Sequence, residues 1–316
     1  SVGIQSPAGK VQAVRDVSLQ LYPGEVLAIV GESGCGKSML CKAIMKLLPR
    51  SAKIEGGQIF ANGVDITNCS EKEMRKLRGK LFSMIFQDPM TALNPTIPIG
   101  KQIAEAILVH EPKLSKEEVY HRVISLMELV GIKQPHERYK LYPYNFSGGM
   151  RQRSMMAIAL AANPKILLAD EPTTALDVTI QAQILQLIAK LRDELGISYL
   201  FISHDLSVVK FISDKIGVMY LGAMMEFGKK KDIFDNPLHP YTKALFSAIP
   251  NPDPDVKMNR IHLAGDIPSP ANPPSGCRFH TRCPRATEEC AKCAPEYREV
   301  EPGHFVACHL CKGCSN

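Results

Sequence analysis

The sequence reads Gly31-Glu32-Ser33-Gly34-Cys35-Gly36-Lys37-Ser38 directly after the apolar run Val26 to Val30 and directly before a helix expected over 37–48. Glycines in such a loop permit a tight turn that aims successive backbone N–H groups at phosphate oxygens. The positive end of the following helix adds to this attraction. The pattern is a P-loop and predicts that the whole stretch binds a nucleotide. Lys37 is expected to reach the β- and γ-phosphates, and Ser38 to ligate Mg²⁺.

A second apolar run, Ile166 to Ala169, ends in the acidic pair Asp170-Glu171. A buried strand that ends in an aspartate delivers a carboxylate to the Mg²⁺ that accompanies a bound nucleotide. We therefore expect Asp170 to be a Mg²⁺ ligand. Glu171 is the next residue, and a carboxylate there is placed to polarise an attacking water as a general base. The pair predicts hydrolysis as well as binding.

Strand and helix patterns alternate around these two motifs. Expected strands cover Val17 to Leu21 and Ser198 to Ser203, and an expected helix covers Thr179 to Leu195. A hairpin pattern occupies Gly56 to Ile66, and the stretch 97–165 is typical of helices. Such alternation predicts an α/β fold with a mainly parallel sheet and covering helices.

The composition changes near residue 235. Prolines are frequent from Asn236 onward, which indicates an irregular appendage, and seven of the ten cysteines lie between Cys277 and Cys314. We therefore divide the chain into residues 1–235 and a Cys-rich C-terminal extension, 236–316. The apolar content of 45% is ordinary and the net charge of +6 is mild. No apolar stretch approaches the roughly 18 residues that span a bilayer, so we expect a cytoplasmic protein.

One further stretch narrows the class of nucleotide-binding protein: Phe146-Ser147-Gly148-Gly149-Met150-Arg151-Gln152-Arg153. Two glycines at the start of a helical run that reaches Ala162 are costly as helix interior. They suit a backbone N–H cradle for a phosphate at a helix N-terminus. The stretch resembles the signature sequence of ABC ATPases, although Phe146 and Met150 stand where Leu and Gln are commonest. In that family the signature of one subunit closes on ATP held by another, which implies that Ser147, Gly148 and Gly149 contact a partner's γ-phosphate.

Three more positions match motifs of the ABC family in the correct order. Gln87 resembles the Q-loop glutamine, which senses Mg²⁺ and the water and couples to membrane subunits. Asp177, in Ala175-Leu176-Asp177, resembles the D-loop. His204 resembles the switch histidine, which contacts the γ-phosphate and orients Glu171. The resemblance thus implies a catalytic group of Glu171, His204 and Gln87.

The resemblance covers about residues 10 to 230 and implies an α/β P-loop NTPase core of the ABC type that uses ATP and Mg²⁺. It also implies an antiparallel β subdomain and a helical subdomain at about 90–160. ABC ATPases usually place an aromatic residue on the first strand to stack on adenine. Here that slot falls near Ile4, which offers only apolar contact.

The extension carries a second resemblance. Its opening, Asn236-Pro237-Leu238-His239-Pro240-Tyr241-Thr242-Lys243-Ala244-Leu245, resembles the start of the C-terminal extension of peptide-importer ATPases. Four cysteines match that extension as well: Cys277, Cys283, Cys290 and Cys308. In that subfamily they can ligate a [4Fe–4S] cluster, so the resemblance implies a cluster here.

Zinc is the open alternative for the tail. Four thiolates satisfy tetrahedral zinc as well as a cubane cluster. The pairs Cys290-x₂-Cys293 and Cys311-x₂-Cys314 also spell a zinc ribbon. The wide gaps between the four matching cysteines favour the iron–sulfur interpretation.

The two resemblances together imply the ATP-hydrolysing subunit of an ABC importer of dipeptides or oligopeptides. Its implied partners are a paralogous ABC ATPase in a heterodimer and two transmembrane permease subunits, with an extracytoplasmic solute-binding protein acting indirectly. Its implied place is the cytoplasmic face of a bacterial inner membrane, as a peripheral subunit without nucleic acid.

Three other functions stay open. Related ATPases serve importers of nickel or other small solutes. An ABC ATPase of DNA repair or chromosome maintenance is an alternative from another class, but such proteins carry long coiled coils or tandem ATPase domains. Neither is visible in this sequence, and the tail lacks the aromatic–basic interleaving of nucleic-acid binding. A regulatory metal-binding protein that uses its ATPase as a switch is the third.

Overall fold

The computed structural model describes residues 1–6, 9–174, 176–249 and 260–311. Its described residues form two compact units, and we treat each by itself. The first unit consists of residues 1–20 and 26–59 and of the chain from 203 onward, and the second of 21–25 and 60–202. No described helix combines the length and the apolar character that a membrane crossing would need.

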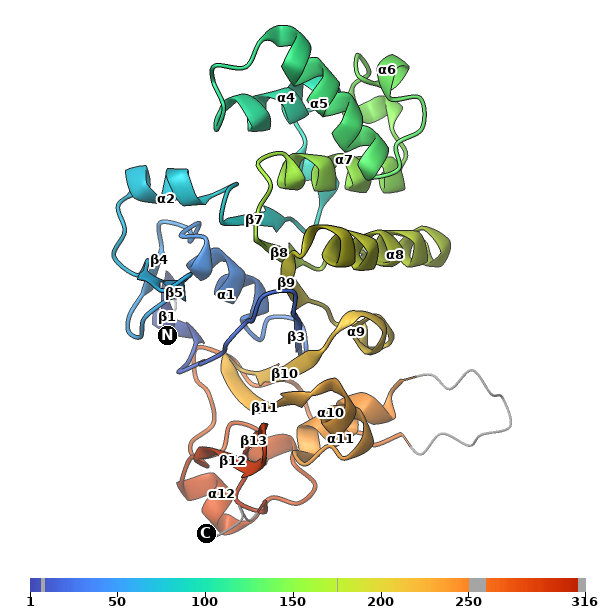
Figure 1. The fold of residues 1–316 in the computed structure, drawn as a ribbon. Helices are drawn as coiled ribbons and strands as arrows, with labels where there is room; N and C mark the ends of the chain where they lie inside the picture. The colour runs from blue at the N-terminus through green and yellow to red at the C-terminus, as the bar shows by residue number, and fades with distance from the viewer. Residues whose placement is uncertain (7–8, 175, 250–259, 312–316) are drawn as a thin grey trace, which may run out of the picture. The chain divides into compact units, whose positions relative to one another are not determined.

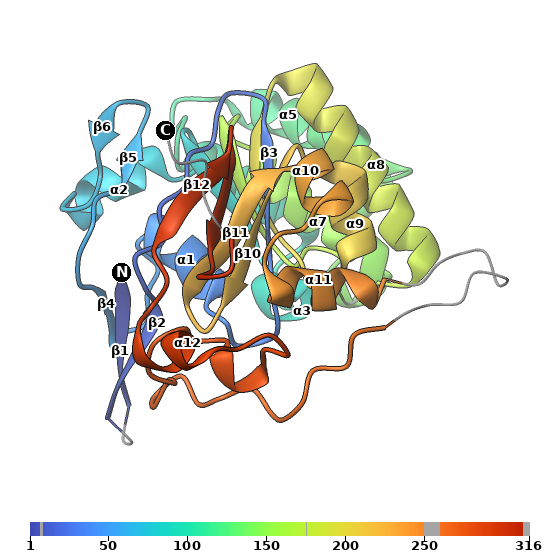
Figure 2. The same ribbon diagram turned by 90° about the horizontal axis from the view of Figure 1, so that it is seen from below.

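The strands of the first unit fall into two groups. A three-stranded antiparallel sheet has the order β2-β1-β4, which are Gly9–Val14, Val2–Ser6 and Ala52–Ile54. The other strands follow the order β12-β13-β11-β10-β3, which are Tyr297–Glu301, His304–Ala307, Ala223–Lys229, Lys215–Tyr220 and Val26–Val30. β3 and β10 are parallel, while β10, β11, β13 and β12 pair antiparallel (Figure 2). All of β3 is buried, so this strand lies in the core.

The residues after 235 join this unit instead of forming a purely irregular tail. β13 adds to β11, and β12 completes a hairpin with β13. Tyr241 and Phe279 of the extension are buried in one hydrophobic cluster with Ala28 of β3 and Val218 of β10. The helices of the unit are α1 (Lys37–Ile44), α9 (Leu206–Ile212), α10 (Lys230–Asp235), α11 (Pro240–Ser247) and α12 (Glu288–Lys292), with a 3₁₀ turn η2 at His280–Arg282.

The second unit combines parallel strands with a group of helices. Its strands β9, β8 and β7 are Ser198–Ile202, Ile166–Asp170 and Phe82–Ile85, and they pair in parallel in that order. The hairpin of β5 (Phe60–Ala61) and β6 (Val64–Asp65) is separate. The helices are α2 (Glu71–Leu77), α3 (Pro89–Ala92), α4 (Ile99–Leu108), α5 (Lys116–Leu129), α6 (Pro135–Arg138), α7 (Gly148–Leu160) and α8 (Val178–Leu195), with a 3₁₀ turn η1 at Pro143–Asn145. α4, α5 and α7 pack on one another, and α7 also packs on α8 (Figure 1).

Most predicted elements are present with small changes at their ends. The predicted strand at Val17–Leu21 is wrong, because these residues form no strand. Asp16 turns the chain at a φ of 44°, and the paired strand before it is β2. The helix predicted over 37–48 ends at Ile44, since Lys46 adopts a left-handed φ of 51°. An α-helix cannot continue through that conformation.

Candidate nucleotide-binding site

The phosphate-binding loop follows β3 in the first unit, and two of its glycines are required by close packing. A Cβ on Gly31 would lie 2.2 Å from the carbonyl oxygen of Met219, and one on Gly36 would lie 2.2 Å from that of Ala13. Both glycines have positive φ, 151° and 101°. Gly34, at 77°, has open space where its Cβ would be. The loop is therefore shaped by its own backbone and by neighbouring backbone, as an N–H cradle requires.

Lys37 begins α1 and lies beneath this loop. The side chain is 5% exposed. Its ammonium group donates to the carbonyl oxygens of Gly31 at 2.8 Å and Glu32 at 3.1 Å. Cys35 is buried beside it, with 3.7 Å between Nζ and Sγ. Burial raises the pKa of the Cys35 thiol, so the thiol stays neutral.

His204 also belongs to the first unit, where it precedes α9. The carboxylate of Asp205 caps α9 by accepting the backbone N–H of Ser207 at 2.9 Å and that of Val208. The hydroxyl of Ser203 accepts the Asp205 N–H at 3.0 Å. The exposed His204 therefore sits on a backbone fixed on both sides.

In the second unit Asp170 ends β8 between two parallel neighbours, and it is 4% exposed. Glu171 follows with a φ of 48°. Glutamate rarely adopts that left-handed conformation, which costs about 1–3 kcal/mol. The Glu171 N–H donates to the carbonyl oxygen of Ile202 at 3.0 Å. This hydrogen bond ties the turn to the last residue of β9.

The structure brings two of the predicted catalytic residues into contact. Gln87 donates from Nε2 to Oε2 of Glu171 at 3.2 Å. Thr174 donates its hydroxyl to the same oxygen at 3.1 Å. Sequence reasoning missed Thr174, although its position three residues after Glu171 was a signal for a local turn contact. The hydrogen bonds from Gln87 and Thr174 therefore help to fix the orientation of this carboxylate.

The signature stretch forms the start of α7. Ser147 is the N-cap, and its hydroxyl accepts the Met150 N–H at 3.4 Å. A Cβ on Gly149 would lie 2.6 Å from Cγ2 of Ile180 on α8, while the nearest atom to one on Gly148 is 3.8 Å away. Gly149 is thus needed for helix packing, a reason that the sequence did not indicate. Gly148 is the more open position.

Asp177 of the predicted D-loop is the N-cap of α8, where its carboxylate accepts the Ile180 N–H at 3.0 Å. Ala175 of the same motif lies outside the described residues. The second unit therefore holds Gln87, Asp170, Glu171, Asp177 and Ser147–Gly149, and the first unit holds residues 31–38 and His204.

The iron–sulfur prediction is wrong. Among the residues that the structure describes, no group of three or more His, Cys, Asp or Glu side chains is arranged to hold a metal ion. This finding removes tetrahedral zinc at Cys277, Cys283, Cys290 and Cys308 as well. Cys314 of the alternative zinc ribbon lies outside the described residues.

The tail cysteines act instead as small apolar residues. Cys277 and Cys290 are buried with Phe279 in the hydrophobic cluster shared with β3 and β10, and Cys283 packs against it. Cys308 belongs to a second cluster with Val300 and Val306. These cysteines therefore contribute to the apolar packing of the extension.

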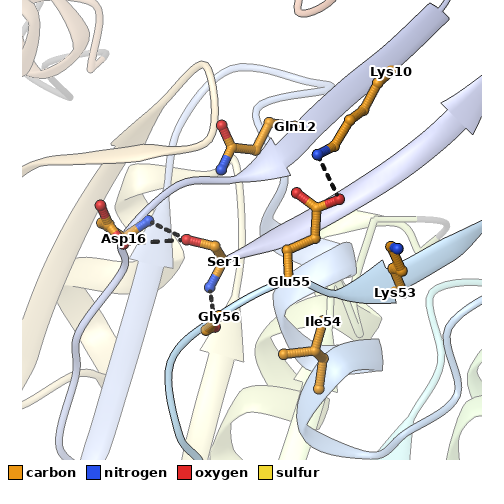
Figure 3. Close-up of a pocket in the computed structure, with 8 residues that line it drawn as sticks. All are labelled: Ser1, Lys10, Gln12, Asp16, Lys53, Ile54, Glu55 and Gly56. Atoms are coloured by element: carbon orange, nitrogen blue, oxygen red, sulfur yellow. Dashed lines mark hydrogen bonds and ion pairs between the residues drawn. The ribbon is translucent and has the colours of Figure 1, made fainter.

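A polar pocket lies on the three-stranded sheet of the first unit (Figure 3). Lys10 and Glu55 form an ion pair across it at 2.9 Å. Its lining residues are Ser1, Lys10, Gln12, Asp16, Lys53, Ile54, Glu55 and Gly56. None of them belongs to the predicted nucleotide site, so we assign the pocket no part in it.

Comparison with known proteins identifies the family of the chain. A family model described as ABC transporter matches residues 14–174, and one described as oligopeptide/dipeptide transporter, C-terminal region, matches 225–290. The chain is 50% identical over 313 residues to the dipeptide transport ATP-binding protein DppD of Bacillus subtilis, covering 98% of this chain and 92% of that protein. It is 45% identical to the oligopeptide transport ATP-binding protein OppD of Escherichia coli, covering 97% and 90%.

A solved structure supports the same assignment. A dimeric ATP-binding cassette in a post-hydrolysis state with ADP and phosphate superimposes with a TM-score of 0.64 and 26% identity, covering 73% of this chain and 99% of that one. The chain therefore belongs to the ABC transporter family, among the ATP-binding proteins of dipeptide and oligopeptide transport.

Proposed function

We propose that the chain hydrolyses Mg-ATP to power the uptake of dipeptides or oligopeptides through membrane permease subunits. Its membership among peptide-transport ATP-binding proteins supports this function over DNA repair or a metal-dependent switch. The observation that carries hydrolysis is the contact of Gln87 with the carboxylate of Glu171, which follows a buried aspartate. Residues 1–235 would form the ATPase domain and residues 236–316 an extension of it.

The residues of the chain suit the nucleotide and its metal ion. The glycine-shaped loop leaves backbone N–H groups for phosphate oxygens, and Lys37 adds a positive charge. The Ser38 hydroxyl and the Asp170 carboxylate are the hard oxygen ligands that Mg²⁺ prefers. When bound, Mg²⁺ neutralises the charge that develops on the transferred phosphoryl group.

In this proposal Glu171 accepts a proton from the attacking water, and Gln87 orients its carboxylate through the 3.2 Å hydrogen bond. His204, which is exposed on a fixed backbone, contacts the γ-phosphate. Ser147 and Gly148, at the exposed start of α7, offer N–H groups to the nucleotide of a second subunit.

We also propose that two such ATPases sandwich two nucleotides, and that the second subunit is a paralogue. The solved cassette with the same fold is described as dimeric, which supports dimerisation. The assembly would lie at the cytoplasmic face of the membrane, attached through two permease subunits. An extracytoplasmic binding protein would deliver the peptide without touching this chain.

The test is the Glu171→Gln variant in the assembled complex. A glutamine keeps the size and the hydrogen bond but cannot take the proton, so steady-state ATP turnover should fall by about 10²–10⁴-fold. Nucleotide binding by the isolated chain should persist. Glu194→Gln, at an exposed glutamate near the end of α8, is the matched control and should turn over ATP like the wild type. Wild-type turnover in Glu171→Gln would overturn the assignment of the base.

A further inference from the structure

The second residue of the phosphate-binding loop is held by the C-terminal extension. Arg282 of η2 donates to the Glu32 carboxylate from both ends of its guanidinium group, at 2.8 Å from Nη1 and 3.2 Å from Nη2. The two side chains are 9% and 25% exposed. A bidentate pair of this kind is stronger than a neutral hydrogen bond and fixes the orientation of both groups. It joins residues that are 250 positions apart in the chain.

The extension also fixes the backbone at Glu32. The hydroxyl oxygen of Tyr241 accepts the Glu32 N–H at 3.0 Å. Tyr241 is fully buried, with its ring centroid 4.8 Å from that of Tyr220 and 5.3 Å from that of Phe279. Because the ring has little room to move, its hydroxyl is a fixed acceptor. Side chain and main chain of one loop residue are therefore both bound to the extension.

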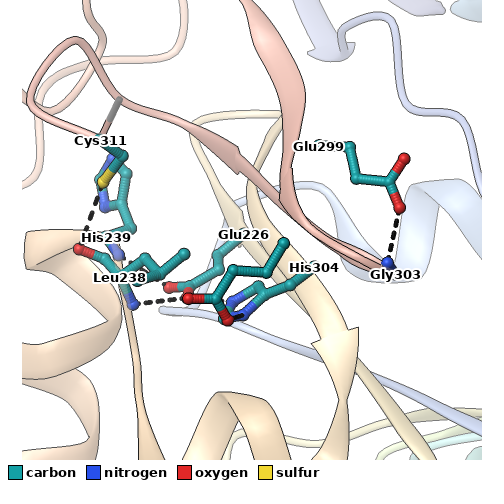
Figure 4. A network of polar contacts seen from close by, with 8 residues as sticks. Glu226, Leu238, His239, Glu299, Gly303, His304 and Cys311 are labelled. Atoms are coloured by element: carbon teal, nitrogen blue, oxygen red, sulfur yellow. Dashed lines mark hydrogen bonds and ion pairs between the residues drawn. The ribbon is translucent and has the colours of Figure 1, made fainter. Parts of the chain in front are cut away.

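A buried network around Glu226, Leu238, His239 and His304 (Figure 4) leads to Tyr241. Glu226 of β11 accepts the N–H groups of Leu238 at 2.7 Å and His239 at 3.0 Å. His239 accepts the Tyr241 N–H on Nδ1 at 3.0 Å and so caps α11. His304 of β13 contacts the same glutamate at 2.8 Å. Continuous buried contacts thus lead from the hairpin of the extension to the phosphate-binding loop.

We propose that Arg282 and Tyr241 are positioning residues of the nucleotide site, which hold Glu32 and the first turn of the loop in the conformation that accepts ATP. A loop rich in glycine loses much conformational freedom when it closes on a ligand. Contacts that order the loop beforehand lower this cost and tighten binding. The extension would therefore set the ATP affinity of the chain, an inference that rests on the proposed function.

The first test is Arg282→Gln in the full chain, with Mg-ATP binding measured by calorimetry. The dissociation constant should rise about 3- to 10-fold, because the loop loses part of its preorganisation. Arg298→Gln is the matched control. Arg298 is a partly buried arginine of the extension that donates to the carbonyl oxygen of Cys311 at 2.6 Å. This control should bind Mg-ATP like the wild type, even if its thermal unfolding midpoint falls as much as that of Arg282→Gln.

A double-mutant cycle separates this pair from a general weakening of the extension. Glu32→Gln should weaken binding like Arg282→Gln, and the double variant should bind no worse than either single one. Arg282→Lys should recover part of the affinity, and Tyr241→Phe should raise the dissociation constant by a smaller factor. In the assembled complex, KM for ATP should rise more than kcat falls.

Three outcomes would overturn the proposal: wild-type affinity in Arg282→Gln, equal weakening in Arg298→Gln, or additive effects of the two partners. If Arg282→Gln does not fold, Tyr241→Phe and Arg282→Lys decide, and wild-type affinity in both rejects the inference. A wild-type chain that does not bind Mg-ATP would instead contradict the proposed function.

Discussion

The phosphate-binding loop, residues 31–38, and the contact region between β11 and the C-terminal extension are held in place by different means. We call this second region the joint; it consists of Glu226, Leu238, His239 and His304. The loop takes its shape from glycines that lie against neighbouring carbonyl groups, as Gly36 does against Ala13. The joint takes its shape from one buried carboxylate, Glu226, which gathers three donors from two other segments. The loop depends on glycines that have no side chain, and the joint depends on the carboxylate of Glu226.

This difference decides which changes each region tolerates. A single added carbon disrupts the loop wherever its glycines touch backbone, while the exposed Ser33 leaves room for a side chain. The joint fails when the Glu226 carboxylate is removed, because the buried N–H groups that it accepts then have no acceptor. Steric and electrostatic variants should therefore act on different regions.

The largest effect is expected for Gly36→Ala. Its Cβ would meet a carbonyl oxygen at 2.2 Å, and alanine disfavours a φ of 101°. Strain and overpacking together should weaken Mg-ATP binding by about a thousandfold, or about 4 kcal/mol. Gly34→Ala is the matched control, because its Cβ would enter open space. It carries only the cost of a left-handed alanine, about 1–2 kcal/mol, or about tenfold. Equal losses in calorimetry would refute the steric argument.

The next effect is on stability at the joint. Glu226→Ala leaves the N–H groups of Leu238 and His239 and the ring of His304 without their acceptor. Removing one partner of such a buried network should lower the free energy of unfolding by about 3–5 kcal/mol, as measured with urea. Glu299→Ala removes an exposed carboxylate that accepts the Gly303 N–H in the same hairpin. Glu299→Ala should lower the free energy of unfolding by only about 1 kcal/mol. An equal decrease in Glu226→Ala and Glu299→Ala would contradict the role of burial.

The same contrast explains what the sequence allowed us to predict. Gly31–Ser38, the apolar strand before it and Asp170 are local patterns, because one stretch of chain contains everything that forms them. The strand at Val17–Leu21 was predicted wrongly since a strand also needs a partner, and β1 and β2 pair instead. The contact of Arg282 with Glu32 joins distant positions and leaves no local signal.

The cysteines show that a local sequence pattern can also predict a site that the described part of the structure does not contain. Their spacing resembles a ligand set, but ligation depends on where three or four side chains point in space. Among the described residues no such arrangement of ligands is present. The left-handed backbone of Glu171 is also invisible in the sequence, because glutamate rarely adopts this conformation and its presence alone does not predict it.

A smaller effect should appear in the pH dependence of the joint. Burial lowers the pKa of His239 from its ordinary 6.5 to about 4, more than the charge of Glu226 raises it. A depressed pKa means that the unfolded chain binds the proton first. The stabilisation that neutral His239 contributes is therefore fully present above pH 6.5 and is lost as the pH falls through about 4. His239→Asn keeps an N-cap for Tyr241 but does not titrate.

Between pH 6.5 and 4 the wild type should lose about 3 kcal/mol more unfolding free energy than His239→Asn. The elevated pKa of His304 is expected in both proteins and largely cancels in the difference. Urea unfolding at several pH values measures it. Parallel pH profiles would show that His239 is not buried in its neutral form, and the joint would then resemble an ordinary surface contact.

The smallest effect concerns Glu171, where a charged side chain and a strained backbone meet in one residue. Its φ of 48° suits glycine, so Glu171→Gly should be more stable than Glu171→Ala by about 1 kcal/mol. This sign is the reverse of the usual penalty for glycine. Both variants should lack ATP turnover, because neither keeps the carboxylate that Gln87 contacts. Urea unfolding of the two side by side decides the point: if alanine is the more stable, the backbone at Glu171 is not held in the left-handed region, and the site stores no strain there.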